Sequence, residues 1–158
     1  MPRRLLVKRS AIHGNGVFAA MDIPAGTPLL PYLGQLRTHA DVEAEHGDNH
    51  QSGHTFLFTL NDDYVIDANQ GGNSARWINH SCNPNCIAYS HEHATGNPQR
   101  ERVIIEALRD IRAGEELSYN YGLTLAVRHT ARIKQLWACR CGTANCTGTM
   151  LKPKSRRA

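Results

Sequence analysis

The 158-residue sequence predicts a mostly β protein built from many short strands. Two observations lead to this class. Short stretches rich in β-branched, aromatic and aliphatic residues recur along the chain, and Gly, Pro, Asn or Asp separates them. Long stretches with a helical apolar period are scarce, which argues against a doubly wound α/β domain. The length suffices for one domain with a core of its own.

The expected strands follow one another along the chain, and turn-forming residues separate them. They span Leu5–Arg9, Gly16–Ala20, Thr27–Leu33, Thr55–Leu60, Tyr64–Asp67, Cys86–Ser90, Arg102–Ala107 and Glu116–Tyr119. Asn61-Asp62-Asp63 predicts a hairpin turn, because Asn and Asp side chains bond to the backbone two residues further on.

Three short segments favour helix. The segment from Thr38 to Glu45 begins with a capping residue and carries acidic residues in its first turns. Ser74–Ile78 is expected to form one turn, and Ala126–Trp137 has a helical composition with weak periodicity. The strand pattern stops around residues 122–138, and the thiol-rich segment that follows is too small to bury a core alone. It needs a metal or the main body to order it.

Composition excludes several classes. The formal charge is +4, and the basic C-terminal tail, which supplies much of it, is expected to be solvated rather than to bind nucleic acid. No apolar run approaches the roughly 18 residues that a membrane span needs. The basic start has an apolar run of three residues ended by Lys8, which does not fit an export signal. A cytoplasmic protein is therefore expected, and the excess of arginine over lysine hints at a bacterial source.

Five cysteines favour a metal site over a disulfide framework in a chain without an export signal. Cys139, Cys141 and Cys146 have C-x-C-x4-C spacing, and zinc takes four thiolates. The fourth thiol must come from afar, which leaves Cys82 and Cys86 as the candidates. Free buried thiols are the alternative, but a loop rich in Gly, Thr and Asn is a poor apolar setting for them.

Three further features carry chemistry, and each has an ordinary structural alternative. The run from Asn79 to Cys82 places an amide, an imidazole, a hydroxyl and a thiol next to one another, which is poor material for a core. His13-Gly14-Asn15-Gly16 lets the backbone approach a ligand closely, or is simply a tight turn. Tyr119 and Tyr121 point the same way in a strand, and they wall a narrow channel or pack as an aromatic pair.

Taken in order, these segments resemble the SET-domain protein-lysine N-methyltransferases that carry a post-SET zinc-binding tail. The resemblance covers about Arg3 to Leu151. The segments that carry it are Ser10–Phe18, Tyr32–Gly34, Tyr64–Ala68, Gly72–Cys82, Gly114–Tyr121 and Cys139–Cys146. Each is weak evidence alone, but the ordered set is specific, because chance matches at six independent places are improbable.

The resemblance implies a SET fold of small curled β-sheets with a threaded segment, a pseudoknot, which is a rare exception to unthreaded topology. It divides the chain into a catalytic domain over 3–122, a zinc-clipped post-SET segment over 123–151 and a basic tail over 152–158. It also implies S-adenosylmethionine as the cofactor. The implied cofactor-binding residues are His13, Gly14, Asn15, Gly16, Phe56, Asn79, His80 and Trp137.

The resemblance assigns roles to three tyrosines and four cysteines. Tyr121 matches the catalytic tyrosine, and Tyr32 is expected to form the opposite wall of the lysine channel. Tyr119 matches a position where a hydroxyl takes up space, which predicts mainly mono- or dimethylation. The implied ligands of a structural zinc ion are Cys82, Cys139, Cys141 and Cys146, so that Cys86 is not expected to bind the metal.

The expected partner is a lysine-bearing basic protein, either histone-like or another DNA-associated protein, with no direct nucleic-acid or membrane partner. Its peptide is expected to add as a strand between Gly53–Leu60 and the zinc tail. If that substrate is a eukaryotic histone, a nuclear or host-delivered protein is expected instead of a cytoplasmic one. The oligomeric state is not predicted. Two rival functions stay open: a catalytically silent module with the same fold, and a zinc-clipped nucleic-acid binder.

Overall fold

The protein is described by a computed structural model, which covers residues 4–12, 14–46, 57–61, 63–121, 130–139, 141–144 and 146–150. The predicted mostly β class is confirmed. The strands are β1 (Leu5–Arg9), β2 (Asn15–Ala19), β3 (Pro28–Pro31), β4 (Gln35–Thr38), β5 (Leu57–Thr59), β6 (Tyr64–Asp67), β7 (Asn79–His80), β8 (Cys86–His91), β9 (Arg102–Ala107) and β10 (Ser118–Tyr119). The helices are α1 (His39–His46) and α2 (Ala131–Leu136), with 3-10 turns at Ser74–Trp77 and Pro98–Arg100.

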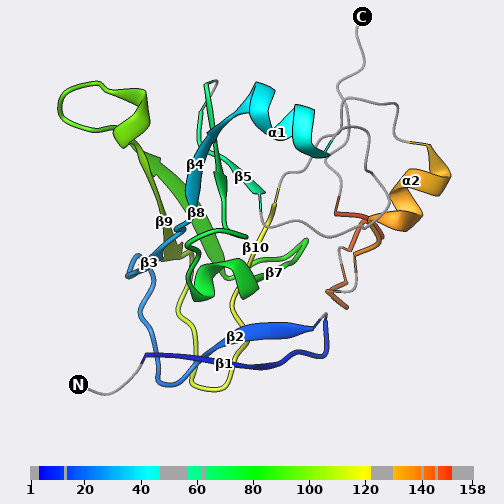
Figure 1. Ribbon diagram of the computed structural model, residues 1–158. Helices are drawn as coiled ribbons and strands as arrows, with labels where there is room; N and C mark the ends of the chain where they lie inside the picture. The colour runs from blue at the N-terminus through cyan, green and yellow to red at the C-terminus, as the bar shows by residue number, and fades with distance from the viewer. Residues whose placement is uncertain are drawn as a thin grey trace, which may run out of the picture.

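The strands form four small sheets (Figure 1). β1 and β2 pair antiparallel, β9 lies between β3 and β8, and β6 lies between β4 and β5. β7 and β10 pair in parallel although 37 residues separate the end of β7 from the start of β10 (118 − 80 − 1). In Figure 1 the sheets are grouped together, and α2 with the segment after it lies to one side.

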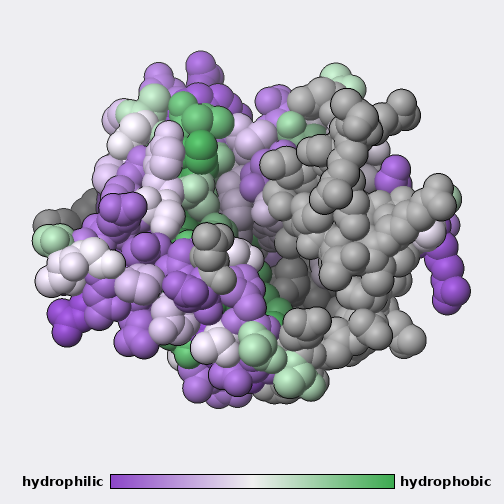
Figure 2. All heavy atoms as spheres, turned by 90° about the horizontal axis from the view of Figure 1, so that it is seen from above, coloured by the Kyte–Doolittle hydropathy of each residue, from purple (hydrophilic) through white to green (hydrophobic). Residues whose placement is uncertain are grey.

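The core gathers one or two side chains from nearly every sheet rather than filling one layer. Its largest fully buried side chains include Val17 of β2, Ile78 beside β7, Ile105 of β9 and Leu117 beside β10. On the face shown in Figure 2, the exposed apolar residues are confined to narrow bands among polar ones. Among the described residues, no helix is long and apolar enough to cross a membrane.

The hairpin prediction is confirmed at the turn between β5 and β6, which pair antiparallel. The side-chain oxygen of Asn61 accepts hydrogen bonds from the backbone N–H groups of Asp63 and Tyr64, both at 2.9 Å. Asn61 also links the turn to the residue before β9, because its side-chain amide donates a hydrogen bond to the carboxylate of Glu101 at 2.9 Å. This turn fixes the register of β5, the strand that contributes an aromatic side chain to the site described below.

Several boundaries differ from the sequence prediction. β4 was not predicted, because Gln35–Thr38 is short and mostly polar; it is an edge strand held by its pairing with β6. β7 was not predicted either, since two residues become a strand only through pairing with β10. The predicted helix over 126–137 is observed as Ala131–Leu136 within the described residues. Residues 122–129 lie outside them.

Candidate active site

The Asn79-His80 dipeptide lies against the tyrosine segment. In the parallel pairing of β7 with β10, Asn79 stands opposite Ser118 and His80 opposite Tyr119. Asn85 reinforces this pairing from the turn after Cys82: its side chain donates to the carbonyl of Glu116 at 2.9 Å and accepts from the N–H of Ser118 at 2.9 Å. Both polar groups of the buried Asn85 amide are therefore used to hold the tyrosine segment in place.

Tyr32 reaches the same region from the end of β3. Its N–H donates to the carbonyl of Val103 at 2.9 Å, and Asn73 brackets the segment by donating to Pro31 and accepting from Leu33. Gly34 explains why the segment reads Tyr-x-Gly: a Cβ at this position would lie 2.5 Å from the carbonyl oxygen of Asp67. Only glycine lets the backbone pass β6 so closely.

The aromatic side chains form a continuous row of ring contacts. Tyr32 contacts Phe58 of β5 with ring centroids 5.0 Å apart, and Phe58 contacts Tyr119 at 6.1 Å. Tyr119 contacts Tyr121 at 4.8 Å, and the His80 ring meets Tyr121 edge-on at 5.3 Å. All four distances lie in the range of favourable tilted or edge-to-face pairs, about 4.5 to 7 Å. Four separate chain segments thus build one aromatic wall.

The three phenols remain protonated near neutral pH. Burial raises the pKa of Tyr121, and the neighbouring charges of Tyr32 and Glu116 raise it further. Burial likewise raises the pKa of Tyr119 and, with the charge of Asp67, that of Tyr32. None of them can therefore act as a phenolate base. Each offers a neutral hydroxyl dipole that can accept or donate a hydrogen bond.

Tyr121 is fixed at both its backbone and its hydroxyl. The hydroxyl donates to the carbonyl of Ile78, which leaves the oxygen lone pairs free to accept. The Tyr121 N–H donates to Nδ1 of His80 at 3.0 Å. Burial lowers the pKa of His80 to about 4, so the ring is neutral near pH 7 and its proton sits on Nε2. Nε2 lies 3.7 Å from Sγ of Cys82, which joins the tyrosine segment to the thiols.

The glycine-containing loop between β1 and β2 lies next to Asn79. Gly14 adopts a left-handed backbone conformation with φ of 49°, and its carbonyl accepts from the N–H of Ser10 at 2.7 Å. The Asn79 amide donates to the carbonyl of Asn15 at 3.3 Å. The structure places Gly14, Asn15 and Gly16 next to Asn79, and His80 follows Asn79 on β7, whereas His13 lies outside the described residues.

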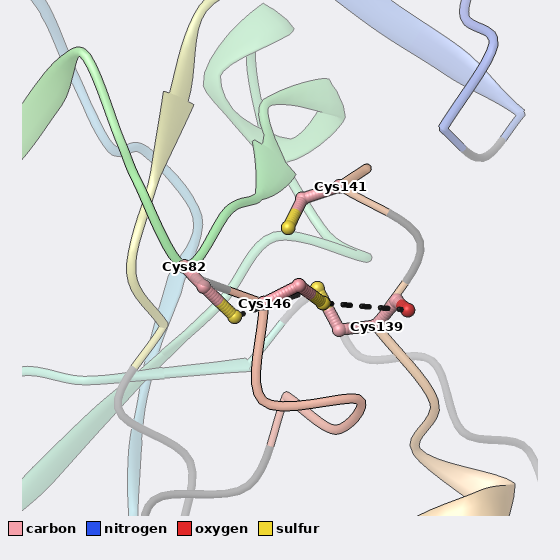
Figure 3. A group of neighbouring side chains, drawn as sticks. All are labelled: Cys82, Cys139, Cys141 and Cys146. Atoms are coloured by element: carbon pink, nitrogen blue, oxygen red, sulfur yellow. Dashed lines mark hydrogen bonds between the residues drawn. The ribbon is translucent and has the colours of Figure 1, made fainter. Parts of the chain in front are cut away.

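The four thiols of Cys82, Cys139, Cys141 and Cys146 come together, and their sulfur atoms all lie within 4.8 Å of one another. Figure 3 shows the side chains converging from the segment after β7 and from the C-terminal segment. A zinc ion with four bonds of about 2.3 Å sets sulfur atoms about 3.8 Å apart at tetrahedral angles. The Cys82 and Cys139 sulfurs are 3.8 Å apart. The donor set and spacing therefore fit a structural zinc ion.

Donors around the cluster favour thiolates. The N–H groups of Thr147 and Gly148 donate to the sulfurs of Cys82 and Cys146, at 3.5 and 3.4 Å. Hydrogen bonds to the charged form stabilise it, which is what a metal ligand requires. Cys86 stands apart: it is buried in the core on β8, and burial raises its pKa to about 12. It lies outside the thiol group.

The structure says little about cofactor binding by two of the residues that the resemblance implies, Phe56 and Trp137. Phe56 lies outside the described residues, as do residues 53–55 of the strand Gly53–Leu60, beside which the peptide is expected to add. Trp137 is buried just after the end of α2, and its indole N–H has no hydrogen-bond partner among the described residues.

Sequence reasoning missed four residues that the structure brings into the site: Phe58, Asn85, Glu116 and Ser10. A clue existed for Phe58, which stands two residues after Phe56 and so shares its face of a strand.

The geometry of the site suits the transfer of a chemical group to a slender side chain that has been stripped of most of its water. Hydroxyls of protonated tyrosines stand beside an aromatic wall, next to a loop with a left-handed glycine and two polar β7 residues. The four neighbouring thiols bring the C-terminal segment close to the end of β7. Buried, protonated phenols and a neutral imidazole make positioning and desolvation the means that this site offers.

The sequence matches the SET domain over residues 14–122. Among curated relatives, a putative histone-lysine N-methyltransferase 1 of Plasmodium falciparum is 34% identical over 93% of this chain. A histone-lysine N-methyltransferase of Chaetomium globosum, named as H3 lysine-4 specific, is 39% identical over 89%. The chain spans only 2% and 12% of the lengths of these two relatives.

Among solved structures, KRYPTONITE in complex with mCHH DNA, an H3(1-15) peptide and SAH superposes with a TM-score of 0.77 and 35% identity. The match covers 95% of this chain and 30% of that one. The family match spans well over half of the sequence, and the fold, the aromatic row and the thiol group agree with it. The chain belongs to the SET-domain family.

Proposed function

We propose that the protein is an S-adenosylmethionine-dependent protein-lysine N-methyltransferase. The observation that carries this proposal is the aromatic row from Tyr32 to Tyr121, placed directly beside the paired segments Asn79-His80 and Ser118-Tyr119. The relatives named as histone-lysine N-methyltransferases and the SAH-bound structural neighbour support it. When bound, S-adenosylmethionine supplies a methyl carbon made electrophilic by its sulfonium.

The residues of the row meet the demands of this chemistry. A free lysine has a pKa of about 10.4, so the site must favour the neutral amine. The aromatic walls of Tyr32, Phe58 and Tyr119 desolvate the ammonium form and lower the lysine pKa. The Tyr121 hydroxyl donates its hydrogen bond to the carbonyl of Ile78. Its oxygen can therefore accept a hydrogen bond from the amine N–H of the lysine and direct the lone pair of the amine toward the methyl carbon.

Cofactor binding is assigned to Gly14, Asn15, Gly16, Asn79 and His80, which the fold brings together at one place. His13, Phe56 and Trp137 remain predictions that rest on the resemblance. We assign Cys82, Cys139, Cys141 and Cys146 to a zinc ion with a structural role, because four thiolates leave no open coordination position. In this proposal the metal holds the post-SET segment against the cofactor side of the site.

The proposed substrate is a lysine in the N-terminal tail of histone H3 or a similar basic peptide. Support comes from the H3 lysine-4 specific relatives and from the H3 peptide bound to KRYPTONITE. If the substrate is a histone, the protein acts in a nucleus. If the substrate is another basic protein, the protein acts in the cytoplasm. The domain limits 3–122, 123–151 and 152–158 remain predictions.

Tyr119 should limit the number of methyl groups transferred. No residue that the structure describes is hydrogen-bonded to its hydroxyl, which is therefore free to hold a water beside the amine. Tyr119→Phe removes that oxygen and makes room for a further methyl, so we expect the main product to shift from mono- and dimethyl-lysine to di- and trimethyl-lysine. Mass spectrometry of the modified peptide measures this shift. An unchanged product distribution would contradict the role of Tyr119.

The proposed function is tested by incubating the zinc-loaded protein with an H3 N-terminal peptide and methyl-labelled S-adenosylmethionine. We expect label on a lysine, located by mass spectrometry. Peptide binding without any transfer would favour the silent module. DNA binding that weakens steeply with salt, together with no affinity for S-adenosylmethionine, would favour the nucleic-acid binder.

A further inference from the structure

Glu116 is the hub of a polar cluster that lies outside the roles assigned so far. Its two carboxylate oxygens accept from the Ser10 hydroxyl at 2.7 and 2.8 Å. One of them also accepts from the Asn79 amide at 2.8 Å. Ser10 begins the β1–β2 loop and Asn79 lies on β7, and the Asn79 amide also donates directly to the Ser10 hydroxyl at 3.1 Å. The carboxylate is therefore one of several contacts that join the β1–β2 loop to β7. Its own position is fixed by the strand that carries the tyrosines.

The cluster holds both ends of the β1–β2 loop. At the start of the loop, the oxygen of Ser10 accepts from the N–H of Ile12 at 2.9 Å. Toward its end, the carboxylate lies directly on Gly16: a Cβ built there would be 2.5 Å from the nearer carboxylate oxygen. Residue 16 must therefore be glycine for the carboxylate to take this position. The loop that is assigned to the cofactor is thus shaped around the side chain of Glu116.

Among the described residues, no ion pair neutralises the negative charge of Glu116. Within the described part of the chain, its polar contacts are the neutral groups of Ser10 and Asn79. The preceding residue provides a contrast, because Glu115 pairs with Arg109 at 3.1 Å. The charge of Glu116 also acts inside the site, since it is one of the causes that raise the pKa of Tyr121, after burial and the charge of Tyr32. A partly buried anion without a counter-charge attracts a cation that enters the same site.

We propose that Glu116 is a positioning residue whose carboxylate fixes the Gly14–Gly16 backbone against Asn79 and whose charge makes the site prefer a sulfonium over the uncharged thioether left after methyl transfer. This inference rests on the proposed function. S-adenosylmethionine carries one more positive charge than S-adenosylhomocysteine, and the two are otherwise closely similar. A charge preference would therefore favour binding of the donor and release of the product.

The preference is measured by calorimetric titration of the zinc-loaded protein with S-adenosylmethionine and with S-adenosylhomocysteine. Glu116→Gln keeps the size of the side chain and removes its charge. Because a unit charge acts over several ångströms in a partly buried site, we expect this variant to weaken S-adenosylmethionine binding about fivefold or more beyond any change for S-adenosylhomocysteine. A purely structural role would weaken both ligands equally.

Two matched variants separate charge from structure. Glu115→Gln removes the same charge from the neighbouring residue, whose carboxylate binds Arg109 and the N–H of Arg112. Ser10→Ala removes a hydrogen bond from the cluster and keeps the charge of Glu116. Both should leave the ratio of the two affinities within about twofold of the wild-type value, since neither removes charge from the site. Glu116→Asp, which retains the charge, should also keep the wild-type ratio even if both affinities fall.

Each outcome of the titrations either supports the role of Glu116 or overturns it. Equal losses for the two ligands in Glu116→Gln, or a changed ratio in Glu116→Asp, overturn the inference and leave the proposed function standing. A wild-type protein that binds neither ligand overturns both. Thermal unfolding of every variant shows whether the fold is intact, and the Glu116→Asp ratio keeps the test valid should Glu116→Gln not fold.

Discussion

Replacing Tyr121 with Phe should lower the rate of methyl transfer by about 10² to 10³, the usual effect of removing one well-placed hydrogen-bonding group from an active site. The ring stays, so its contacts with Tyr119 and His80 persist. The lost hydroxyl frees the carbonyl of Ile78 and removes the oxygen that orients the amine. The measurement is label transfer to peptide under single-turnover conditions.

The control for this substitution is Tyr64→Phe. It also removes a phenol hydroxyl and a hydrogen bond, in this case an exposed one from Gln99 at 2.8 Å that involves no residue of the aromatic row. Both variants should bind S-adenosylmethionine within a few-fold of wild type and should lose about 1 kcal/mol of stability from the missing hydrogen bond. A Tyr121→Phe protein that retains the rate of Tyr64→Phe would remove Tyr121 from the mechanism.

The rate should rise with pH through the neutral and mildly alkaline range, and Tyr121 should not cause the rise. Burial raises the pKa of the Tyr121 phenol, so the hydroxyl stays protonated throughout that range. Deprotonation of the substrate lysine is the step that higher pH favours.

Removing the metal should unfold the C-terminal segment and abolish activity. Structural zinc contributes on the order of 10 kcal/mol to the folding of small segments. In the described part of residues 137–150, the other contacts are a few backbone hydrogen bonds, such as those from Cys139 to Gly148 and from Met150 to Trp137. Within the described residues, Ala138 and Thr149 form an isolated bridge, and α2 has six residues. Chelation should increase proteolytic cleavage C-terminal to β10, lower the melting temperature and weaken cofactor binding. Added zinc should reverse these effects.

Single cysteine variants test the ligand set. Cys141→Ser should bind zinc much more weakly in a competition with a chromophoric chelator, since it replaces one of four soft donors. Cys86→Ala is the matched control, because Cys86 lies in the core outside the thiol group and its loss should leave the metal content unchanged. Equal zinc content in the two variants, or a wild-type protein without zinc, would refute the metal assignment.

The strands that depend on local pattern were predictable. Val, Ile and Leu runs bounded by turn residues gave β1, β6 and β9 with their observed limits, and Asn61 marked the β5–β6 turn. β4 and β7 were not predictable in this way, because their residues have no strand pattern. β7 becomes a strand only when β10, far along the chain, supplies the hydrogen bonds that it lacks alone.

The same division holds for the site. The types and order of its residues are written in the sequence, since a thiol spacing, a pair of glycines and two tyrosines at i and i+2 are local features, and together they identified the family. Spacing alone could not decide between Cys82 and Cys86 as the fourth thiol. In the structure Cys82 faces the C-terminal thiols and Cys86 points into the core.

The sequence by itself determined the fold class and the family, and it named most of the residues to which the proposed function assigns roles. Only the tertiary structure decided that Phe58 completes the aromatic row, that His80 bridges Tyr121 and Cys82, and that Glu116 joins the β1–β2 loop to Asn79. The physical reason is that these contacts join residues far apart in the chain. Burial, hydrogen-bond partners and the field of an unpaired carboxylate exist only once distant segments have packed together.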